Sequence, residues 1–255
     1  MPRRKREISE IGMYHVYVRG INNEFIFNQV REKNYLKRII RKHLSEYNVE
    51  IYAYCIMSNH AHLMIKSEQI SELSMFMSKI LAEYAAYYNF KWKRNGHVFQ
   101  NRFKSEIIEE SKYFWNCLKY IHMNPVKAKM VSNVLQYRYS SIHDYKNGKS
   151  NIIHENALKF YQKRFNGWKE LLEFHGVYGD GIFLGTNEEK ETRYIEIAWK
   201  LIWEIQKENA LDNTVEVLEE PELRKDYLKK LKETIKISDS KLKKVYKQIK
   251  DNLIA

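Results

Sequence analysis

Two histidines, two residues apart, are the first side chains in this sequence whose type and spacing point to chemistry. His60 and His62 lie in an alternating run, with Ala61 and Leu63 at the intervening positions. Alternate residues of a strand face the same side of a sheet, so this pattern would place two imidazoles together and the apolar residues against a core. Neutral imidazole is the commonest metal ligand in proteins. A single His-x-His pair is a weak indication, and a second group of ligands is needed to support a metal site.

A tyrosine and an asparagine later in the chain provide that second group. Tyr120 and Asn124 would share one face of a helix predicted over residues 112–124. Pro125 would end this helix, because proline disfavours helical geometry in the residue before it. His122 lies on another face and is not counted as a ligand. Taken with the paired histidines, the amide and the phenol would complete a three-ligand metal site with an adjacent nucleophile.

The elements that must position these side chains follow from the periodicity of the sequence. Period-2 runs rich in β-branched and aromatic residues predict strands, and apolar residues at helical spacing predict helices. In chain order we predict a strand at 14–19, a helix at 31–47, strands at 49–56 and 60–66, a helix that opens at Ser71, a strand at 103–109 and the helix at 112–124. His15, in the first strand, is interpreted as a structural histidine. This order of elements predicts an α+β domain with a central antiparallel sheet.

Charge points to a polyanionic partner. The formal net charge is +12 and the isoelectric point is near 9.4. Cations alternate with aromatic residues between Phe90 and Lys104, a pattern that suits single-stranded nucleic acid because bases stack while phosphates pair. The segment from Arg224 to Lys250 holds eleven Lys or Arg against three acids. The alternative interpretation is that these lysine-rich faces are simply solvated.

Composition limits the remaining classes. A chain of 255 residues has room for one large domain, or for one domain and a smaller appendage. Its apolar runs are too short to span a bilayer, and its first residues lack the apolar segment of a secretory signal. Cys55 and Cys117 provide neither a disulfide framework nor zinc-finger spacing, which fits a reducing cytoplasm.

The sequence resembles a known family at these same residues. His60-Ala61-His62 matches the His-hydrophobic-His motif of HUH nucleases, and Tyr120 to Asn124 with the following Pro-Val-Lys-Ala matches a run of single-tyrosine transposases. More narrowly, the chain resembles the REP-associated tyrosine transposases of bacteria. Short segments at residues 14–20, 54–60 and 99–104 are also similar to the family's motifs at the same places and extend the resemblance over residues 1–145. Lys129 departs from it, since the family often has glycine there.

The resemblance implies both a fold and a reaction. It implies a ferredoxin-like HUH nuclease domain over residues 1–145 that cleaves single-stranded DNA with a divalent metal. His60, His62 and Asn124 would hold the ion, and Tyr120 would attack phosphorus, stay on the 5′ phosphate and free a 3′ hydroxyl. The resemblance and the phosphoryl chemistry favour Mg²⁺ or Mn²⁺, whereas affinity order alone would favour zinc or copper.

The implied partner is single-stranded or hairpin DNA at a palindromic repeat, with no membrane partner. The protein would act as a monomer or homodimer in the bacterial cytoplasm, associated with the nucleoid through DNA. The stem would be bound through its shape and phosphates, and an unpaired guide sequence through base edges. The basic residues expected to contact DNA are Arg3, Arg4, Lys5, Arg6, Arg19, Lys93, Arg94, Arg102 and Lys104.

Residues 146–255 are predicted to form an all-helical C-terminal domain beyond the resemblance. Residues 146–155 are expected to be a linker, and residues 223–252 to form two basic helices joined around 237–240. The second of these helices could be the recognition helix of a helix-turn-helix. A solvated helical hairpin is an equally good interpretation.

Three functions remain open at this stage. The first is an active endonuclease and strand transferase. The second is a DNA-binding or regulatory protein that keeps the fold without the chemistry, and the third is an RNA-binding protein. Intact His60, His62, Tyr120 and Asn124 favour the first, because a protein that only binds DNA does not need all four.

Overall fold

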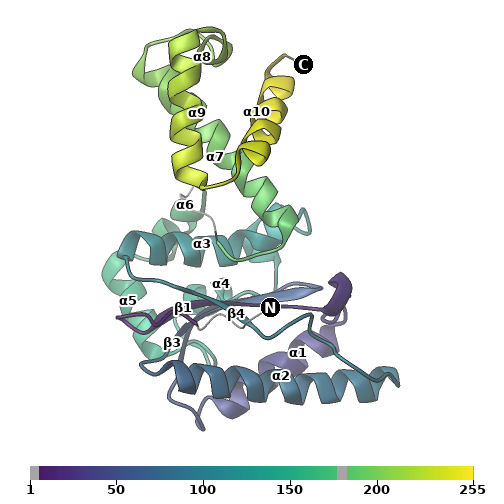
Figure 1. Ribbon diagram of the computed structural model, residues 1–255. Coiled ribbons are helices and arrows are strands. Elements are labelled where there is room, and N and C mark those ends of the chain that lie inside the picture. The colour runs from purple at the N-terminus through teal and green to yellow at the C-terminus, as the bar shows by residue number, and fades with distance from the viewer. Residues whose placement is uncertain (1–5, 177–182, 255) are drawn as a thin grey trace. The chain divides into compact units, whose positions relative to one another are not determined.

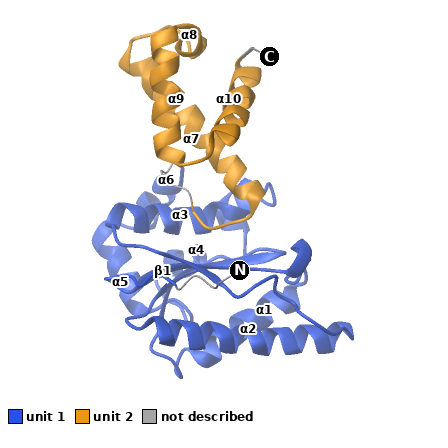
Figure 2. Ribbon diagram, viewed as in Figure 1, with its two compact units in different colours: residues 1–177 blue, residues 178–255 orange. Residues whose placement is uncertain are grey.

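The computed structural model describes residues 6–176 and 183–254. The chain divides into two compact units, residues 1–177 and residues 178–255 (Figure 2). Each unit has its own core and is described by itself. Among the described helices, none combines the length and the apolar character needed to cross a bilayer.

Unit 1 is built on a four-stranded antiparallel sheet. Its strands are β1 (Met13–Arg19), β2 (Glu50–Ile56), β3 (His60–Lys66) and β4 (Lys104–Ile107), in the spatial order β2-β3-β1-β4. Helix α1 (Val30–His43) connects β1 to β2, and α2 (Ile70–Trp92) connects β3 to β4. This β-α-β-β-α-β connectivity is that of ferredoxin-like sheets. The predicted α+β domain with a central antiparallel sheet is therefore confirmed.

The two faces of the sheet differ in chemistry. Val16 lies opposite Leu63 and Val18 opposite Ala61 in the β1–β3 ladder, and all four are buried. Helices α1 and α2 cover this apolar face (Figure 1). The opposite face carries the alternate residues of β1 and β3, including both histidines of the His-x-His pair, and helix α3 (Ser111–Lys127) covers it. One sheet thus separates an apolar core from a buried polar layer.

Helix α3 is longer than the sequence indicates. The prediction that it ends at Asn124 is wrong, because Pro125 lies inside it and the Ala128 amide still donates to the Asn124 carbonyl at 2.9 Å. A proline in the last turn removes only one helical hydrogen bond, so the turn can close around it. The helix is followed by Lys129 in the left-handed region, at φ 54°. Glycine adopts this conformation without the cost that a side chain brings.

Residues 146–176 belong to unit 1, whereas the sequence analysis assigns them to the C-terminal domain. Three helices follow α3 in this unit: α4 (Ile142–Asn147), α5 (Glu155–Arg164) and α6 (Trp168–Gly176). The unit also has two short 3-10 turns, η1 (Ile21–Asn23) after β1 and η2 (Val134–Gln136) between α3 and α4. The expected linker is attached to the sheet, since the His154 amide donates to the Ile51 carbonyl at 2.9 Å. Phe160 stacks on Trp115 of α3, with ring centroids 5.0 Å apart. Aromatic packing on α3 therefore moves the boundary to residue 177.

Over residues 183–254, unit 2 is a bundle of four helices. These are α7 (Asn187–Glu208), α8 (Val215–Glu219), α9 (Pro221–Ile235) and α10 (Asp239–Ile254). Their apolar faces share one core, which includes Ile202, Val217, Tyr227, Leu231 and Ile249. The predicted all-helical character of this part of the chain and its two basic helices are confirmed.

A buried chain of polar groups fixes the outer face of α3. His122 contacts the Ser141 hydroxyl through Nε2 at 2.8 Å and the His175 Nε2 through Nδ1 at 3.0 Å. Nδ1 of His175 donates to the Leu171 carbonyl at 2.6 Å. Burial lowers the pKa of His122 well below its usual value and the pKa of His175 to about 4. Both rings are therefore neutral in the folded protein near pH 7.

We predict that acid weakens unit 1 through His175. The unfolded chain binds a proton near pH 6.5, whereas the folded chain resists it until about pH 4. The unfolding free energy should therefore fall as pH drops through this window, by about 1.4 kcal/mol per pH unit once well below pH 6.5. Urea unfolding of the full chain at pH 7.5 and pH 5 measures this. Burial lowers the pKa of His122 as well, so acid acts through both rings. His175→Gln removes one of the two titrating groups and should reduce the difference between the two pH values without abolishing it; an equal pH dependence in both proteins would contradict the assignment.

Candidate metal site and nucleophile

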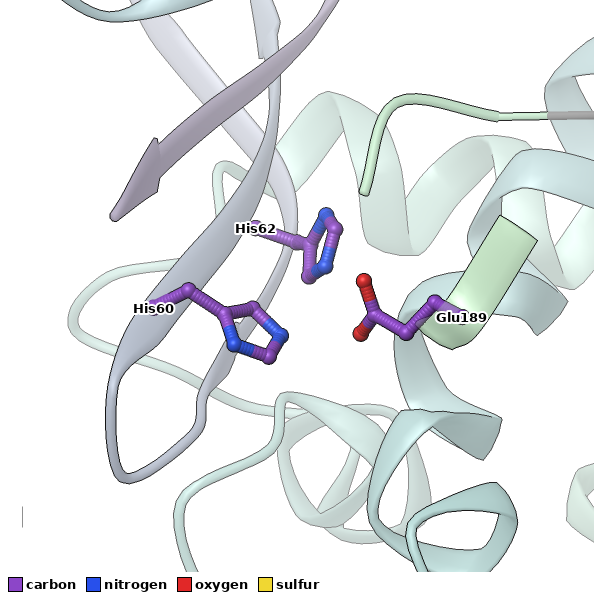
Figure 3. Close-up of side chains that lie close together, drawn as sticks. All are labelled: His60, His62 and Glu189. Atoms are coloured by element: carbon purple, nitrogen blue, oxygen red, sulfur yellow. The ribbon is translucent and has the colours of Figure 1, made fainter. Parts of the chain in front are cut away.

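The polar face of the sheet brings the two predicted histidine ligands together. His60 lies opposite Arg19, and His62 opposite Tyr17, in the β1–β3 ladder. The His60 and His62 ring centroids are 5.0 Å apart and the ring planes are at 88°. Figure 3 shows these imidazoles side by side on β3. Strand alternation alone positions this pair, as the sequence predicts.

Glu189, also drawn in Figure 3, belongs to unit 2. Its carboxylate accepts a hydrogen bond from the Thr186 amide at 2.5 Å, and its own amide donates to the Thr186 hydroxyl at 3.0 Å. These two bonds form the capping box at the start of α7.

The two histidines are each held through Nδ1. In His60 this atom lies 2.6 Å from the Asn59 amide oxygen. An amide oxygen can only accept, so Nδ1 of His60 carries the proton and Nε2 keeps its lone pair. In His62, Nδ1 lies 3.0 Å from Nε2 of His15. Both contacts leave the Nε2 side of each ring as the position for a ligand bond.

Helix α3 presents the phenol to this polar face. The Tyr120 ring meets the His62 ring edge-on, with centroids 5.3 Å apart and an interplanar angle of 84°. Asn124 follows one turn later and is buried. Its Nδ2 donates to the Tyr120 carbonyl at 3.0 Å. His122, between them, contacts Ser141 and His175 instead, as expected of a residue that is not a ligand.

The amide oxygen of Asn124 is the clearest sign of a ligand position. This Oδ1 atom is buried, and no described residue donates a hydrogen bond to it. A buried polar atom without a partner costs about 1–3 kcal/mol, so its persistence needs an explanation. Two imidazole nitrogens and an amide oxygen are donors that a divalent first-row cation accepts. His60, His62 and Asn124 therefore fit the metal site that the sequence predicts.

Arg19 is the predicted DNA-contacting residue that lies nearest the histidines in the sheet. It is the cross-strand neighbour of His60 and is half-buried, with its Nε atom fully buried. Within the described residues, no side chain or carbonyl forms an ion pair or hydrogen bond with the Arg19 guanidinium. A partly buried cation without a partner favours an anionic ligand, and guanidinium matches a phosphate in two-point geometry.

A groove of about 640 Å³ lies along the predicted basic and aromatic loop. Arg6 and Arg102 line it, and the Arg6 guanidinium lies 3.9 Å from the centroid of the Phe103 ring. Desolvation by burial is the larger cause that lowers the pKa of Arg6, and the like charge of the neighbouring Arg102 lowers it further. The loop is tied to the site, because the Gln100 amide donates to the Arg19 carbonyl at 3.0 Å.

The other predicted basic residues are placed differently. Lys93 is exposed and ends α2 in a left-handed conformation, and Lys104 is exposed on β4. Arg94 forms an ion pair with Glu24, so its charge is already partly compensated. Arg3, Arg4 and Lys5 lie outside the described residues.

Three residues next to the predicted ligands were not foreseen as part of the site. His15 is interpreted from the sequence as structural, yet it contacts His62 directly. Glu106 and Asn59 are not singled out. The sequence indicates only that His15 shares a strand face with Tyr17 and Arg19. Its position beside His62 depends on the pairing of β1 with β3, which the sequence does not state.

Known proteins resemble this chain over the region that carries the site. The family model described as "Transposase IS200 like" matches residues 10–124. A Haemophilus influenzae protein named "Putative REP-associated tyrosine transposase" is 30% identical over 133 residues, which covers 45% of this chain and 75% of the relative. A solved structure described as a REP-associated tyrosine transposase bound to a REP hairpin is 21% identical, with a TM-score of 0.48, over 56% of this chain and 84% of that one.

We predict that Asn124 contributes directly to cation binding. Asn124→Ala should weaken Mn²⁺ binding by more than about tenfold, because it removes one of three ligands. Isothermal titration of the full chain measures the affinity. Asn89→Ala is a matched control: Asn89 is also a helical asparagine whose Nδ2 donates to a carbonyl, that of Gly96, and whose Oδ1 lacks a partner. Equal Mn²⁺ affinity in the two variants would remove Asn124 from the site.

Proposed function

This chain belongs to the IS200-like transposase family, and from that premise we propose that it cuts and rejoins single-stranded DNA beside a hairpin through a covalent bond to Tyr120. The relative that shares 30% identity over three quarters of its length supports the family. The observation that carries the proposal is the edge contact between the Tyr120 and His62 rings, 5.3 Å apart. It puts the only tyrosine of the transposase-like motif beside the only His-x-His pair in the sequence.

The proposed metal ligands are His60, His62 and Asn124, with Mg²⁺ or Mn²⁺ as the ion. When bound, such a cation polarises a phosphate oxygen as a Lewis acid and offsets charge in the transition state. The donor set supports this assignment, as does the buried Oδ1 of Asn124 that no described residue satisfies. Asn59 supports it further, because its amide oxygen accepts the proton of His60 on Nδ1.

Tyr120 is the proposed nucleophile. Its Oη would form a bond to phosphorus as the bond from phosphorus to the 3′ oxygen breaks, so the phenol loses a proton and the 3′ oxygen gains one. A free phenol has a pKa near ~10 and must be deprotonated to attack efficiently. Lys127 supports this step, since its Nζ lies 6.0 Å from the Tyr120 ring centroid and a nearby cation favours the phenolate.

The phosphotyrosine bond would conserve the energy of the cleaved phosphodiester. A 3′ hydroxyl could then attack this phosphorus, release Tyr120 and rejoin the strand without a nucleotide cofactor. The ring contact with His62 lies within one chain, which supports attack in cis by a monomer or by each subunit of a homodimer.

Arg19 is the proposed partner of the scissile phosphate. It lies across the ladder from His60, and no described residue compensates its charge. The groove lined by Arg6 and Arg102 would carry the adjoining DNA, because the Gln100–Arg19 hydrogen bond joins the groove to the site.

A DNA-binding protein without catalysis is the second candidate function. The observation that favours it is that neither the lining of the groove nor the exposed lysines of unit 2 include Tyr120, His60 or His62. Binding of DNA to these surfaces would not require the catalytic residues. Such a protein would bind a hairpin and form no covalent adduct. Comparison of ribose and deoxyribose hairpins separates an RNA-binding role from both.

Unit 2 is proposed to add a second contact to DNA. Lys225, Lys229 and Lys236 are exposed along one face of α9 and just past its end. On α10, Lys243, Lys247 and Lys250 are exposed at the spacing of one helix face. Among the described residues no acid forms a salt bridge with these lysines, although the charge of Asp239, which is paired with Lys232, also interacts with Lys243. In a helix-turn-helix arrangement α10 would be the recognition helix, and in either arrangement these lysines would bind phosphates.

Tyr120→Phe should abolish covalent trapping on DNA. Protein incubated with a single-stranded hairpin substrate and Mn²⁺ should form an adduct that survives denaturing electrophoresis, and chelation of the metal should prevent it. Phenylalanine keeps the ring against His62 and removes only the nucleophile, so hairpin affinity should change less than about threefold. Tyr137→Phe is the control, because the Tyr137 hydroxyl donates to the Ile56 carbonyl and its ring contacts Tyr139 rather than a histidine of the site. An adduct that persists in Tyr120→Phe would refute the assignment.

The α10 lysines should control affinity and its salt dependence. Replacing Lys243, Lys247 and Lys250 together by Glu should weaken hairpin binding and lower the slope of log affinity against log salt by about one for each lysine that contacts a phosphate. The same three positions changed to Arg keep the charge and should bind like the unmodified protein. Fluorescence anisotropy across a salt series measures both quantities. Identical slopes for the Glu and Arg proteins would show that α10 is simply solvated.

A further inference from the structure

A second histidine lies directly behind the ligand His62. His15 on β1 is fully buried, and its Nε2 lies 3.0 Å from Nδ1 of His62. The two rings stack, with centroids 5.2 Å apart and planes at 23°. In the ladder His15 is opposite Met64, so it reaches His62 diagonally on the same sheet face. The contact is therefore built by the register of β1 and β3.

The direction of this hydrogen bond decides whether His62 can bind a cation. A neutral imidazole carries one proton, on either Nδ1 or Nε2. If Nδ1 of His62 donates to His15, Nε2 of His62 keeps a lone pair for a metal. If His15 donates instead, Nε2 of His62 carries the proton and cannot be a ligand without losing it.

Glu106 on β4 selects the first direction. It is the cross-strand partner of His15, and its Oε2 lies 3.9 Å from Nδ1 of His15. This distance is an ion-pair distance rather than a short hydrogen bond. The negative charge still favours a proton on the near nitrogen of His15, which leaves the far nitrogen, Nε2, as the acceptor for His62.

We propose that His15, supported by Glu106, is a positioning residue that keeps the proton of His62 on Nδ1 and so presents Nε2 of His62 to the cation. The inference rests on the metal site of the proposed function. Asn59 performs the same task for His60, at 2.6 Å from its Nδ1. Each ligand histidine thus has its own partner, and partners of this kind orient metal-binding imidazoles and raise their basicity.

The proposal concerns one proton, so nitrogen NMR of histidine-labelled, metal-free protein tests it first. The unmodified protein should show His62 with its proton on Nδ1. His15→Phe removes the acceptor and Glu106→Gln removes the charge, and both should shift His62 toward the other tautomer. His15→Gln offers an amide oxygen as acceptor and should restore the Nδ1 proton. A merely structural role for His15 would leave this signature unchanged.

Mn²⁺ affinity of the same proteins, measured by titration, gives the second readout. We expect His15→Phe and Glu106→Gln to weaken Mn²⁺ binding by about 10–100-fold, and His15→Gln to recover most of the loss. His43→Phe is the matched control: His43 is an equally buried histidine, but it lies on α1 and pairs with Glu46 and Glu83. It should reduce stability without changing the affinity.

The outcomes separate the two proposals. Unchanged Mn²⁺ affinity in His15→Phe and Glu106→Gln would overturn the role of His15 while the metal site stands. Failure of the unmodified protein to bind Mn²⁺ would overturn the metal site, and with it the presentation of Nε2 to a cation, whichever tautomer NMR reports. A proton on Nε2 of His62 in the unmodified protein would refute the positioning role even if Mn²⁺ binds.

Discussion

The packing of α3 against a polar sheet face is the constraint on which the rest of this structure depends. Most sheets bury apolar side chains under a helix, whereas this face buries His15, His60 and His62. A helix that covers such a layer must bring polar groups of its own, because buried polar atoms without partners are costly. Helix α3 meets this requirement with Tyr120 and Asn124. A rotation of the helix by one residue, about 100°, would replace them with Ile121 and Pro125 in one direction and with Lys119 and Met123 in the other.

The opposite faces of α3 are also fixed, which explains how its register is maintained. Trp115 stacks with Phe160 on α5, and His122 joins His175 of α6 through a buried hydrogen bond. Ser141 links the same chain to the sheet, since its hydroxyl accepts a hydrogen bond from the Tyr54 amide at 2.9 Å. Residues far from the sheet face therefore decide where the phenol lies. The helices over 155–176, which the sequence analysis places in another domain, contribute to the geometry of the site.

The site itself is held in two layers. The proposed ligand atoms come from strand alternation and one helix turn, and a second set of residues contacts them. Asn59 and His15 lie against Nδ1 of the two histidines, and Glu106 lies near His15. Arg19 extends the layer toward the groove, as a cation with no partner among the described residues. Positive charge, the proposed ligands and the proposed nucleophile thus converge at the β1–β3 pair, an arrangement that suits phosphoryl chemistry.

The sequence by itself determined the elements, the faces and the candidate residues. Period-2 alternation put His60 and His62 on one face, and helical spacing put Tyr120 and Asn124 on another, because both patterns depend only on local backbone geometry. Local geometry could not give the end of α3, since closure around Pro125 depends on the turn that follows it. It could not give the boundary at residue 177 either, which follows from aromatic packing across distant positions. Only the tertiary structure decided that His15 lies behind His62 with Glu106 behind His15, because that chain joins three strands whose order and register the sequence does not state.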